Sequence, residues 1–332
     1  MNIGNSSLYE IANAIKGIGP KVTLYPHVNM DGDTLGSCIA LAYALQAMGK
    51  NITIVLAEEI PENLAFLDSE MEFCMKAEDN KELCMNSDAA IIIDSGELNR
   101  LPGREEYFLS GTVKICVDHH GTAEPFCDYN YIDPDAAATG QIIWNLIKEL
   151  GVQLSDIEKI KIAEAIFTAI TTDTGNFQYS NTQKETHEIM VELYDWGLNA
   201  SRVSVEIYQS NRVERLRITA EVLSKMELIC NGKVAIAYCS QDMLLKTGGR
   251  MEETEWIVGE LRGIRGVEVA VFLKEDKPNQ IKASLRSKNY YNVAELAKEF
   301  GGGGHIRASG YTSHKSLYES IQEIKKRMQN EL

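Results

Sequence analysis

Three apolar segments in the first half of the chain run directly into aspartate and histidine residues. The segments, each with the first residue of its polar run, are Lys21–Tyr25 with His27, Ala89–Ile93 with Asp94, and Thr112–Val117 with Asp118. Short apolar runs of this kind are typical of strands buried on both faces of a parallel sheet. Because ligands of such sheets bind beyond the carboxyl ends of the strands, we expect the polar side chains to meet at one edge.

The stretches between these strands predict the crossover helices that a parallel sheet requires. A helix is predicted over Thr34–Met48, and a further strand at Asn51–Leu56. A longer helix begins at a capping box formed by Ser155 and Glu158 and runs to about Thr171. We therefore expect a doubly wound parallel sheet in the N-terminal part of the chain.

The second half of the chain predicts a helical connector and a smaller α/β domain. Its predicted elements are strands Val234–Cys239, Val267–Leu273 and Gln280–Arg286, with helices around Glu253–Leu261 and after Asn292. A chain of 332 residues exceeds what one hydrophobic core usually organises. We predict an α/β fold with the parallel-sheet domain over residues 1–186, the connector over 187–224 and a mixed-sheet domain over 225–332. The active site is expected in the cleft between the two domains.

The balance of charge limits the partners that the chain can have. Its formal net charge is −15 and its pI is about 5.0, so it lacks the broad basic face that follows a long phosphate backbone. Attraction for phosphates would have to come from bound metals or from a few arginines. Small phosphorylated ligands therefore fit better than long nucleic acids.

Cysteine use and hydropathy predict a cytoplasmic location. The seven cysteines are odd in number, form no CxxC pair and lie mostly in apolar runs, which indicates buried thiols in a reducing compartment. Residues 1–7 carry no basic stretch followed by an apolar one. No run of about 18 apolar residues occurs, so we expect neither a signal peptide nor a membrane span.

The polar runs combine aspartate oxygens with a minority of imidazoles, and together they predict two divalent cations. Oxygen ligands suit Mg²⁺ or Mn²⁺, imidazole tips the choice towards Mn²⁺, and the lack of cysteine argues against structural zinc. The expected ligand sets are His27, Asp31 and Asp94 for one ion, and Asp33, Asp94, His119 and Asp173 for the other. A shared Asp94 would hold the ions roughly 3.5–4 Å apart. Water between them would supply hydroxide for attack on phosphorus.

Each of these motifs has an ordinary structural explanation when it is taken alone. Asp31-Gly32-Asp33 is a common turn or helix cap, Asp94-Ser95-Gly96 is a common turn, and a His-His pair is more often a surface or core feature. Three of the predicted strands nevertheless end in metal ligands, and three of the six histidines fall in these motifs. The joint pattern favours a metal site.

A run of four glycines, Gly301–Gly304, precedes His305 in the second domain. Consecutive glycines permit positive φ and let backbone N–H groups approach an anion closely. His305 could then donate to a phosphate, and Arg286 could clamp it with two parallel hydrogen bonds. Taken alone, such a run is more often a flexible loop that ends a helix, so its meaning depends on the first domain.

In order and spacing, these residues resemble the motifs of the DHH phosphoesterase superfamily. The motif residues are His27, Asp31, Asp33, Asp94, Asp118, His119, His120 and Asp173. The Gly-Gly-Gly-Gly-His run is similar to the signature of the DHH-associated C-terminal domain, and the resemblance spans about Val22 to Tyr311. The likeness is greatest to the two-domain nanoRNase or pAp phosphatase group, the bifunctional oligoribonucleases.

The resemblance implies a reaction and a role for each residue. It implies hydrolysis of dinucleotides and very short oligonucleotides, such as pApA and pGpG, to mononucleotides, and of 3′-phosphoadenosine 5′-phosphate (pAp) to AMP. It implies two Mn²⁺ ions, with Mg²⁺ as an alternative metal. Two catalytic side chains are implied, Asp118 to orient its neighbours and His120 to contact the substrate phosphate. The far end of the substrate would be bound by Arg286, Gly303, Gly304 and His305.

Other functions share part of this pattern. Inorganic pyrophosphatases of the superfamily lack the glycine–histidine signature, and RecJ-type exonucleases carry additional nucleic-acid-binding domains. A stand-alone cyclic dinucleotide phosphodiesterase remains an alternative, as does a catalytically silent nucleotide sensor, although no metal ligand is missing here. We expect short oligonucleotides, dinucleotides and pAp as substrates, with no membrane or long nucleic acid as partner. A homodimer is left open.

Overall fold

The chain folds into two compact units. The computed structural model describes residues 4–121 and 123–329, apart from the side chain of His305. The units are Met1–Ser210, here called unit 1, and Asn211–Leu332, here called unit 2. The three-part division predicted from the sequence, over 1–186, 187–224 and 225–332, stays a prediction.

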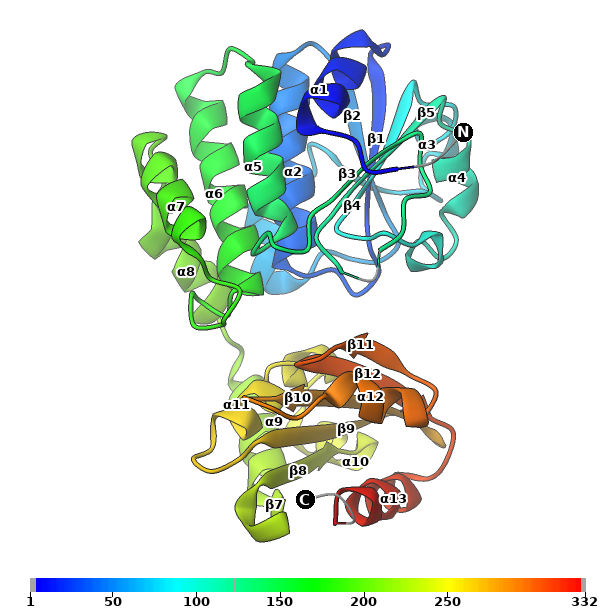
Figure 1. The fold of residues 1–332 in the computed structure, drawn as a ribbon, viewed down its shortest axis with the longest axis vertical. Coiled ribbons are helices and arrows are strands. Elements are labelled where there is room, and N and C mark those ends of the chain that lie inside the picture. The colour runs from blue at the N-terminus through cyan, green and yellow to red at the C-terminus, as the bar shows by residue number, and fades with distance from the viewer. Residues whose placement is uncertain (1–3, 122, 330–332) are drawn as a thin grey trace. The chain divides into compact units, whose positions relative to one another are not determined.

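A six-stranded parallel sheet forms the centre of unit 1 (Figure 1). Its strands are β1 (Lys21–Pro26), β2 (Asn51–Leu56), β3 (Cys74–Lys76), β4 (Ala89–Ile93), β5 (Val113–Asp118) and β6 (Tyr129–Ile132). Their order in space is β3-β2-β1-β4-β5-β6. The order reverses between β1 and β4, and this switch point is where open parallel sheets bind their ligands.

Helices cover both faces of this sheet, because alternate strand residues point to opposite sides. Leu24 and Ile91 pack into one core, whereas Tyr25 and Ile92 pack into a second core. In Figure 1, α2, α5 and α6 lie on one side of the strands and α3 and α4 on the other. The helices of unit 1 are α1 (Leu8–Gly17), α2 (Gly32–Ala47), α3 (Lys81–Cys84), α4 (Glu105–Leu109), α5 (Thr139–Leu150), α6 (Asp156–Asp173), α7 (Lys184–Asp195) and α8 (Ala200–Tyr208), with the 3₁₀ turns η1 (Glu62–Asp68) and η2 (Leu98–Arg100).

Two glycines let α2 and α5 pack unusually close to α6. A Cβ atom on Gly36 of α2 would lie 2.4 Å from the carbonyl oxygen of Ala165 in α6. A Cβ atom on Gly140 of α5 would lie 2.4 Å from the Cβ atom of Ala169, also in α6. Neither distance leaves room for a side chain, so these glycines are required by the packing. The three helices form a compact layer against the sheet.

Unit 2 contains a second six-stranded sheet, of order β11-β12-β10-β9-β8-β7. Its strands are β7 (Glu227–Ile229), β8 (Val234–Cys239), β9 (Val269–Lys277), β10 (Gln280–Ser287), β11 (Gly303–His305) and β12 (Ala308–Ser313). Strands β8 and β9 pair in parallel, and the other described pairs are antiparallel. The sheet is therefore mixed.

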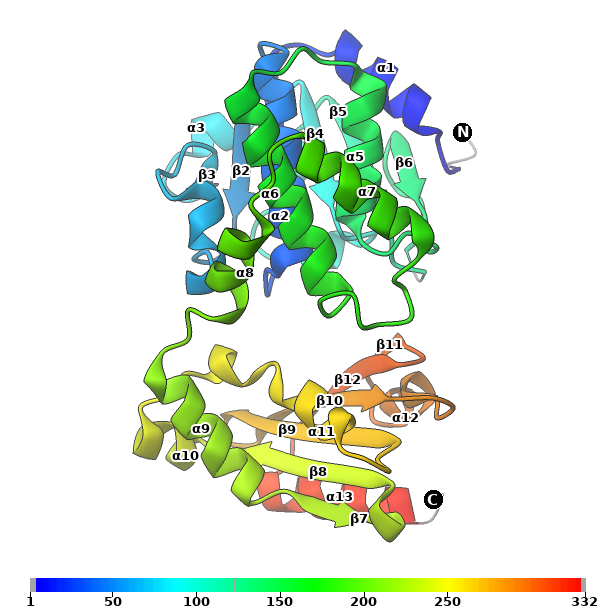
Figure 2. The same cartoon turned by 90° about the vertical axis from the view of Figure 1, so that its left-hand side faces the viewer.

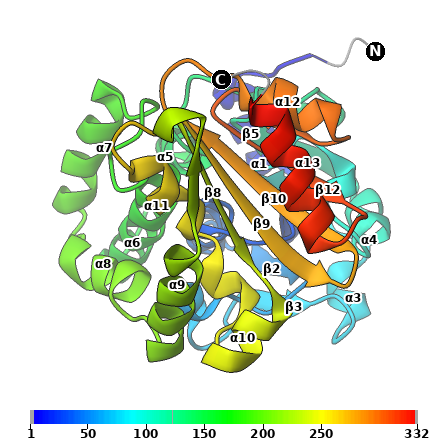
Figure 3. The ribbon, with the colours of Figure 1, turned by 90° about the horizontal axis from the view of Figure 1, so that it is seen from below.

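Helices also cover both faces of the unit 2 sheet. In Figure 3, α12 and α13 lie on one side of the strands, and α9, α10 and α11 lie on the other. Each side encloses its own apolar core. The helices are α9 (Val213–Ser224), α10 (Gln241–Thr247), α11 (Ile257–Gly263), α12 (Val293–Glu299) and α13 (Leu317–Gln329), with the 3₁₀ turns η3 (Cys230–Gly232) and η4 (Met251–Thr254).

The parallel sheet of unit 1 and the mixed sheet of unit 2 confirm the predicted α/β fold class. The predicted helix over Glu253–Leu261 is wrong in detail, since η4 and α11 divide that stretch. Within the described residues all seven cysteines are thiols and six of them are buried, as the sequence predicts. No helix in the described part of the chain is long and apolar enough to cross a membrane.

The close packing of α2 on α6 can be tested by adding one methyl group. We expect Gly36→Ala to lower the free energy of unfolding by about 1–3 kcal/mol, because the new Cβ atom would collide with a backbone carbonyl that cannot move alone. Gly17→Ala in α1 is the matched control, because no described atom lies within 4 Å of its added Cβ atom. Urea denaturation measures both variants. Equal stabilities would show that the helices separate without cost.

Candidate metal centre

Three neighbouring strands deliver polar side chains to the carboxyl edge of the unit 1 sheet. His27 follows β1, Asp94 follows β4, and Asp118 is the last residue of β5. Because β4 pairs with both β1 and β5, the three strands lie side by side. Asp94 has a φ of 61°, a left-handed conformation that is uncommon for a residue with a side chain. Such conformations persist where the surrounding structure holds them, often at functional sites.

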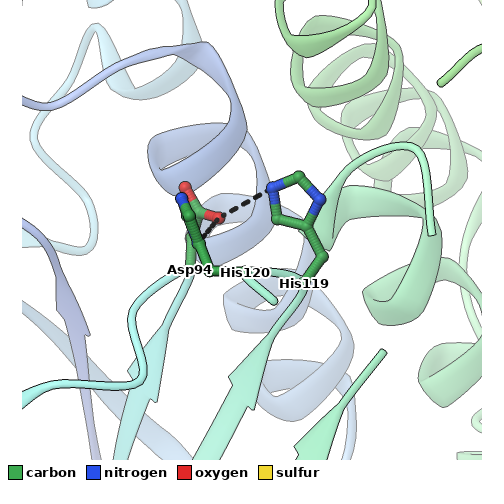
Figure 4. Close-up of side chains that lie close together, drawn as sticks. All are labelled: Asp94, His119 and His120. Atoms are coloured by element: carbon green, nitrogen blue, oxygen red, sulfur yellow. Dashed lines mark ion pairs between the residues drawn. The ribbon is translucent and has the colours of Figure 1, made fainter. Parts of the chain in front are cut away.

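The carboxylate of Asp94 is buried at the centre of these side chains. Its Oδ2 lies 3.2 Å from Nε2 of His27. Its Oδ1 lies 3.6 Å from Nε2 of His119 and 3.8 Å from Nδ1 of His120 (Figure 4). The hydroxyl of Thr139 donates to the same Oδ1 at 2.8 Å. The two oxygens of one carboxylate thus face two different groups of donors.

The first group consists of His27, Asp31 and Asp94, whose potential ligand atoms all lie within 4.8 Å of one another. Nε2 of His27 lies 3.9 Å from Oδ2 of Asp31. As the N-cap of α2, Asp31 accepts the N–H groups of Asp33 and Thr34 with its other oxygen, Oδ1. Capping therefore fixes the carboxylate and leaves one oxygen directed at the site.

The second group consists of Asp33, His119 and Asp173, whose potential ligand atoms also lie within 4.8 Å of one another. Nε2 of His119 lies 3.7 Å from Oδ2 of Asp33 and 3.7 Å from Oδ2 of Asp173. Asp173 is the last residue of α6. A Cβ atom on Gly32 would lie 2.5 Å from the hydroxyl oxygen of Thr172, so only glycine lets the start of α2 lie against the end of α6. This contact brings Asp33 beside Asp173.

The first turn of α5 holds Asp33 in place. Its Oδ2 accepts the N–H of Thr139 at 2.7 Å, and its Oδ1 accepts the N–H of Gly140 at 2.8 Å. The hydroxyl of Ser37 adds a third hydrogen bond at 3.2 Å. The N-cap of α5 is Ala138, which has no side-chain cap, so a carboxylate 106 residues from Thr139 takes that role. The positive end of the helix favours this anion.

Two further side chains brace the loops that carry the ligands. Glu58 accepts the N–H of Met30 at 2.9 Å. The side-chain amide of Asn181 donates to the carbonyl oxygens of Ala137 at 2.8 Å and of Asp173 at 3.2 Å. Roles for Thr139, Glu58 and Asn181 are not evident from the sequence. Their partners lie far away along the chain, so no local pattern marks them.

Hydrogen bonds to the backbone define which nitrogen of each imidazole faces the carboxylates. Nδ1 of His27 lies 2.8 Å from the carbonyl oxygen of Val28, and Nδ1 of His119 lies 3.2 Å from that of Ala136. A carbonyl oxygen only accepts, so Nδ1 of each imidazole carries a hydrogen and Nε2 faces the carboxylates, with a lone pair when the ring is neutral and as an N–H donor when it is protonated. The lone pair of a neutral imidazole repels the carboxylate oxygens that it faces, so either a proton on Nε2 or a bound cation must lie between them. The donor set therefore fits divalent cations bound by oxygen and imidazole.

The pKa values of the site show the same excess of negative charge. Burial raises the pKa of Asp33, and the charges of Asp94 and Asp173 raise it further. Burial also raises the pKa of Asp173 to about 7, although His119 opposes the rise. Burial works to raise the pKa of Asp94, but its hydrogen bond to His27 and the nearby imidazoles lower it to about 2. In the metal-free protein, protons therefore neutralise part of the negative charge that a bound cation would neutralise.

Asp118 and His120 form a separate pair beside this cluster. Asp118 is fully buried, and its Oδ1 accepts the backbone N–H groups of His119 at 2.8 Å and of His120 at 3.2 Å. Nδ1 of His120 donates to the same oxygen at 2.7 Å. Burial works to lower the pKa of His120, but this hydrogen bond and the surrounding carboxylates raise it to about 9. His120 is therefore a cation near neutral pH whose orientation is set by Asp118.

In unit 2 the predicted substrate-binding residues lie on the two strands that flank β12. Arg286 of β10 and His305 of β11 both pair with Ala308 of β12. Gly304 has a φ of 131°, and a Cβ atom there would lie 2.7 Å from the carbonyl oxygen of Ala308, so the position requires glycine. Around Gly303, no described atom lies within 4 Å of an added Cβ atom. The side chain of His305 is outside the described residues.

Comparison with known families and proteins agrees with this architecture. Residues 21–194 match the family described as "DHH family, N-terminal domain", and residues 231–332 match the DHHA1 domain. The bifunctional oligoribonuclease and PAP phosphatase NrnA of Thermus thermophilus is 31% identical over 94% of this chain and 93% of its own length. The protein of the same name from Bacillus subtilis is 27% identical over 87% of this chain and 88% of its own length.

One solved structure is similar over nearly the whole chain. The crystal structure of an exopolyphosphatase-related protein from Bacteroides fragilis has a TM-score of 0.88 and 26% sequence identity. The match covers 97% of this chain and 95% of that protein. The fold described above is therefore shared with a protein whose structure has been determined.

The raised pKa values of Asp33 and Asp173 predict how cation binding depends on pH. A carboxyl group must lose its proton to bind a metal, so the affinity for Mn²⁺ or Mg²⁺ should fall as the pH drops below about 7. In the metal-free protein the same groups bind protons that the unfolded chain releases. Stability should therefore decrease as the pH rises from about 4 to about 7 through Asp173, and the raised pKa of Asp33 acts in the same direction.

Thermal unfolding with and without Mn²⁺ measures this linkage. A cation present at about 100 times its Kd adds about 2.7 kcal/mol to the free energy of unfolding. We expect the Mn²⁺-induced rise in Tm to be larger at pH 8 than at pH 6, and calorimetry to detect released protons. Asp94→Asn serves as the control, because Mn²⁺ should not raise the Tm of this variant. A rise in Tm of equal size at every pH would contradict the prediction.

Proposed function

The chain belongs to the DHH family, and from this premise we propose that it is a phosphoesterase that acts on short nucleotides with the aid of two divalent cations. The observation that carries the proposal is the position of Asp94, whose two oxygens each face a different group of potential ligands. A carboxylate shared in this way suits a pair of ions that act together on one phosphate.

The proposed substrates are linear dinucleotides and very short oligonucleotides, such as pApA and pGpG, which are cleaved to mononucleotides. The phosphomonoester pAp, which is converted to AMP, is the second proposed substrate. The names of the relatives from Thermus thermophilus and Bacillus subtilis, both bifunctional oligoribonuclease and PAP phosphatase, support this choice. The net charge of −15 supports small phosphates over long nucleic acids.

The proposed cofactor is a pair of Mn²⁺ ions, with Mg²⁺ as an alternative. His27, Asp31 and Asp94 would hold one ion. The second ion would be held by Asp33, Asp94, His119 and Asp173. When bound, such ions lower the pKa of water so that hydroxide is available for attack on phosphorus near neutral pH.

The side chains around the ligands would position the substrate. We propose that His120, a cation oriented by Asp118, contacts the phosphate that reacts. In unit 2, Arg286, Gly303, Gly304 and His305 would bind the far end of the substrate. No described atom lies within 4 Å of a Cβ atom added at Gly303, and this free space supports the close approach of an anion to the backbone. The cytoplasmic location and the homodimer considered from the sequence stay predictions.

Removal of the shared carboxylate oxygen tests the proposed reaction. We expect Asp94→Asn to lower the rate of pAp and pApA hydrolysis by more than about 100-fold, because even groups behind the ligands of metal sites contribute about 10- to 100-fold. The assay contains Mn²⁺ and compares pApA, pGpG, pAp, cyclic di-AMP and pyrophosphate. Asp156→Asn is the matched control, because Asp156 is 97% exposed at the other end of α6.

Each outcome of this panel assigns a function. Activity on linear dinucleotides and pAp supports the proposal, whereas exclusive activity on cyclic di-AMP would replace it with a cyclic dinucleotide phosphodiesterase. Nucleotide binding without hydrolysis of any member would indicate a silent sensor. Retention of most of the activity in Asp94→Asn would exclude the proposed site.

Arg286 is expected to contribute to binding more than to the chemical step. Loss of a hydrogen-bonded charge weakens binding by about 1.5–3 kcal/mol, so Arg286→Ala should raise KM about 10- to 100-fold with kcat nearly unchanged. Arg286→Lys should recover part of the loss, because lysine keeps the charge without the planar fork. Arg265→Ala, at an exposed position of unit 2, is the control. An unchanged KM for every substrate would remove Arg286 from the site.

A further inference from the structure

An exposed tyrosine lies in the loop that follows the potential ligand Asp173. Tyr179 is 41% exposed, which is high for a large aromatic side chain. Its backbone N–H donates to the carbonyl oxygen of Thr174 at 3.0 Å. Tyr179 is therefore folded back onto Thr174, the residue next to Asp173, although the two are five positions apart in the chain. Figure 2 shows the loop between α6 and α7 at the end of unit 1 toward which the arrow of β2 points.

The loop is held in one uncommon conformation. Gly175, Asn176 and Phe177 have φ values of 56°, 58° and 63°, so three consecutive residues are left-handed. The N–H of Asn176 donates to the carbonyl oxygen of Thr171 at 2.7 Å, and the N–H of Phe177 donates to the hydroxyl of Thr174 at 3.1 Å. Left-handed residues with side chains cost free energy and persist where other contacts hold them. These hydrogen bonds hold the loop that carries Tyr179.

The ring of Tyr179 lies directly on the backbone of Gly175. A Cβ atom on Gly175 would lie 2.3 Å from Cζ and 2.4 Å from Cε1 of the ring. The glycine therefore supports the ring at its hydroxyl end, and no other residue would fit beneath it. An aromatic ring supported on one side and exposed elsewhere can offer a flat apolar surface to a ligand.

Two other aromatic residues lie near the end of α6. Phe177 stacks on His187 with ring centroids 5.6 Å apart and packs against the core of unit 1. The hydroxyl of Tyr208 donates to the carbonyl oxygen of Thr171 at 3.0 Å. Burial raises the pKa of Tyr208, and the neighbouring Tyr179 adds to the rise, which is consistent with adjacent phenols. Of these rings, Tyr179 has the largest exposed surface.

We infer that Tyr179 is a platform on which a nucleobase of the substrate stacks. The inference rests on the proposed function, and it names a specificity residue that the ligand sets do not include. The base would belong to the nucleoside whose phosphate lies at Asp94 and His120. Stacking on an aromatic ring tolerates every base, because each base has a π face. The enzyme would therefore prefer phosphates that carry a base and discriminate little between adenine and guanine.

The test distinguishes the contribution of the base to binding from that of the phosphate. Tyr179→Ala should raise KM for pAp about 10-fold and leave kcat nearly unchanged, whereas Tyr179→Phe should match the wild type. Tyr194→Ala is the matched control, because Tyr194 is 59% exposed on α7. Calorimetry with Mg²⁺ then compares AMP with ribose 5-phosphate. The substitution to alanine should weaken AMP binding about 10-fold and leave ribose 5-phosphate binding unchanged.

Two results would overturn the inference. One is an equal KM for pAp in the wild type and Tyr179→Ala, and the other is an equal loss of affinity for AMP and ribose 5-phosphate, which would indicate only a structural role. A wild type that hydrolyses no short nucleotide would contradict the proposed function instead. In that case the calorimetric comparison still decides whether Tyr179 binds a base.

Discussion

The repulsion among carboxylates at the carboxyl edge of the unit 1 sheet is the interaction on which the rest of the site depends. Asp33 and Asp94 are almost completely buried, and like charges in such a place disfavour the folded chain unless something opposes them. The protein opposes them with N–H groups from the first turn of α5, the Thr139 hydroxyl and two imidazoles. They stabilise the charge of Asp94, whereas the pKa values of Asp33 and Asp173 stay raised. A divalent cation would complete the balance, and the ligand geometry of the cluster fits one.

The architecture follows from the need to hold these charges together. Only a parallel sheet places the ends of β1, β4 and β5 at one edge, and only the order reversal between β1 and β4 opens space there. Asp33 and Asp173 come from helices instead, so α2 and α6 must approach closely. Glycines at positions 32 and 36 make that approach possible. The compact helix layer is thus part of the site as well as part of the core.

Most of the fold and much of the site could be predicted because the signals are local. The apolar runs before His27, Asp94 and Asp118 predict strands and their edge, and both the α/β class and DHH family membership are confirmed. Strands β3 and β6 were missed because they have three and four residues. Helix α5 was missed because its N-terminus is capped by Asp33, a partner far away in the sequence. The grouping of ligands around each oxygen of Asp94 likewise depends on side-chain geometry that no spacing encodes.

The charge of the centre also sets an order of events for the proposed reaction. A phosphate carries the same sign as ionised aspartates, so the aspartates that are ionised without metals oppose the group that the site is proposed to cleave. His120 is the one side chain of the Asp118–His120 pair that can attract the phosphate, and the ionised carboxylates around it oppose that attraction. In the proposed reaction, binding of the phosphate would therefore depend on the metals. Stacking on Tyr179 involves no charge, so base recognition would be independent of the metals and of salt. Electrostatic attraction would then bind the phosphate of the substrate, and aromatic stacking would bind its base.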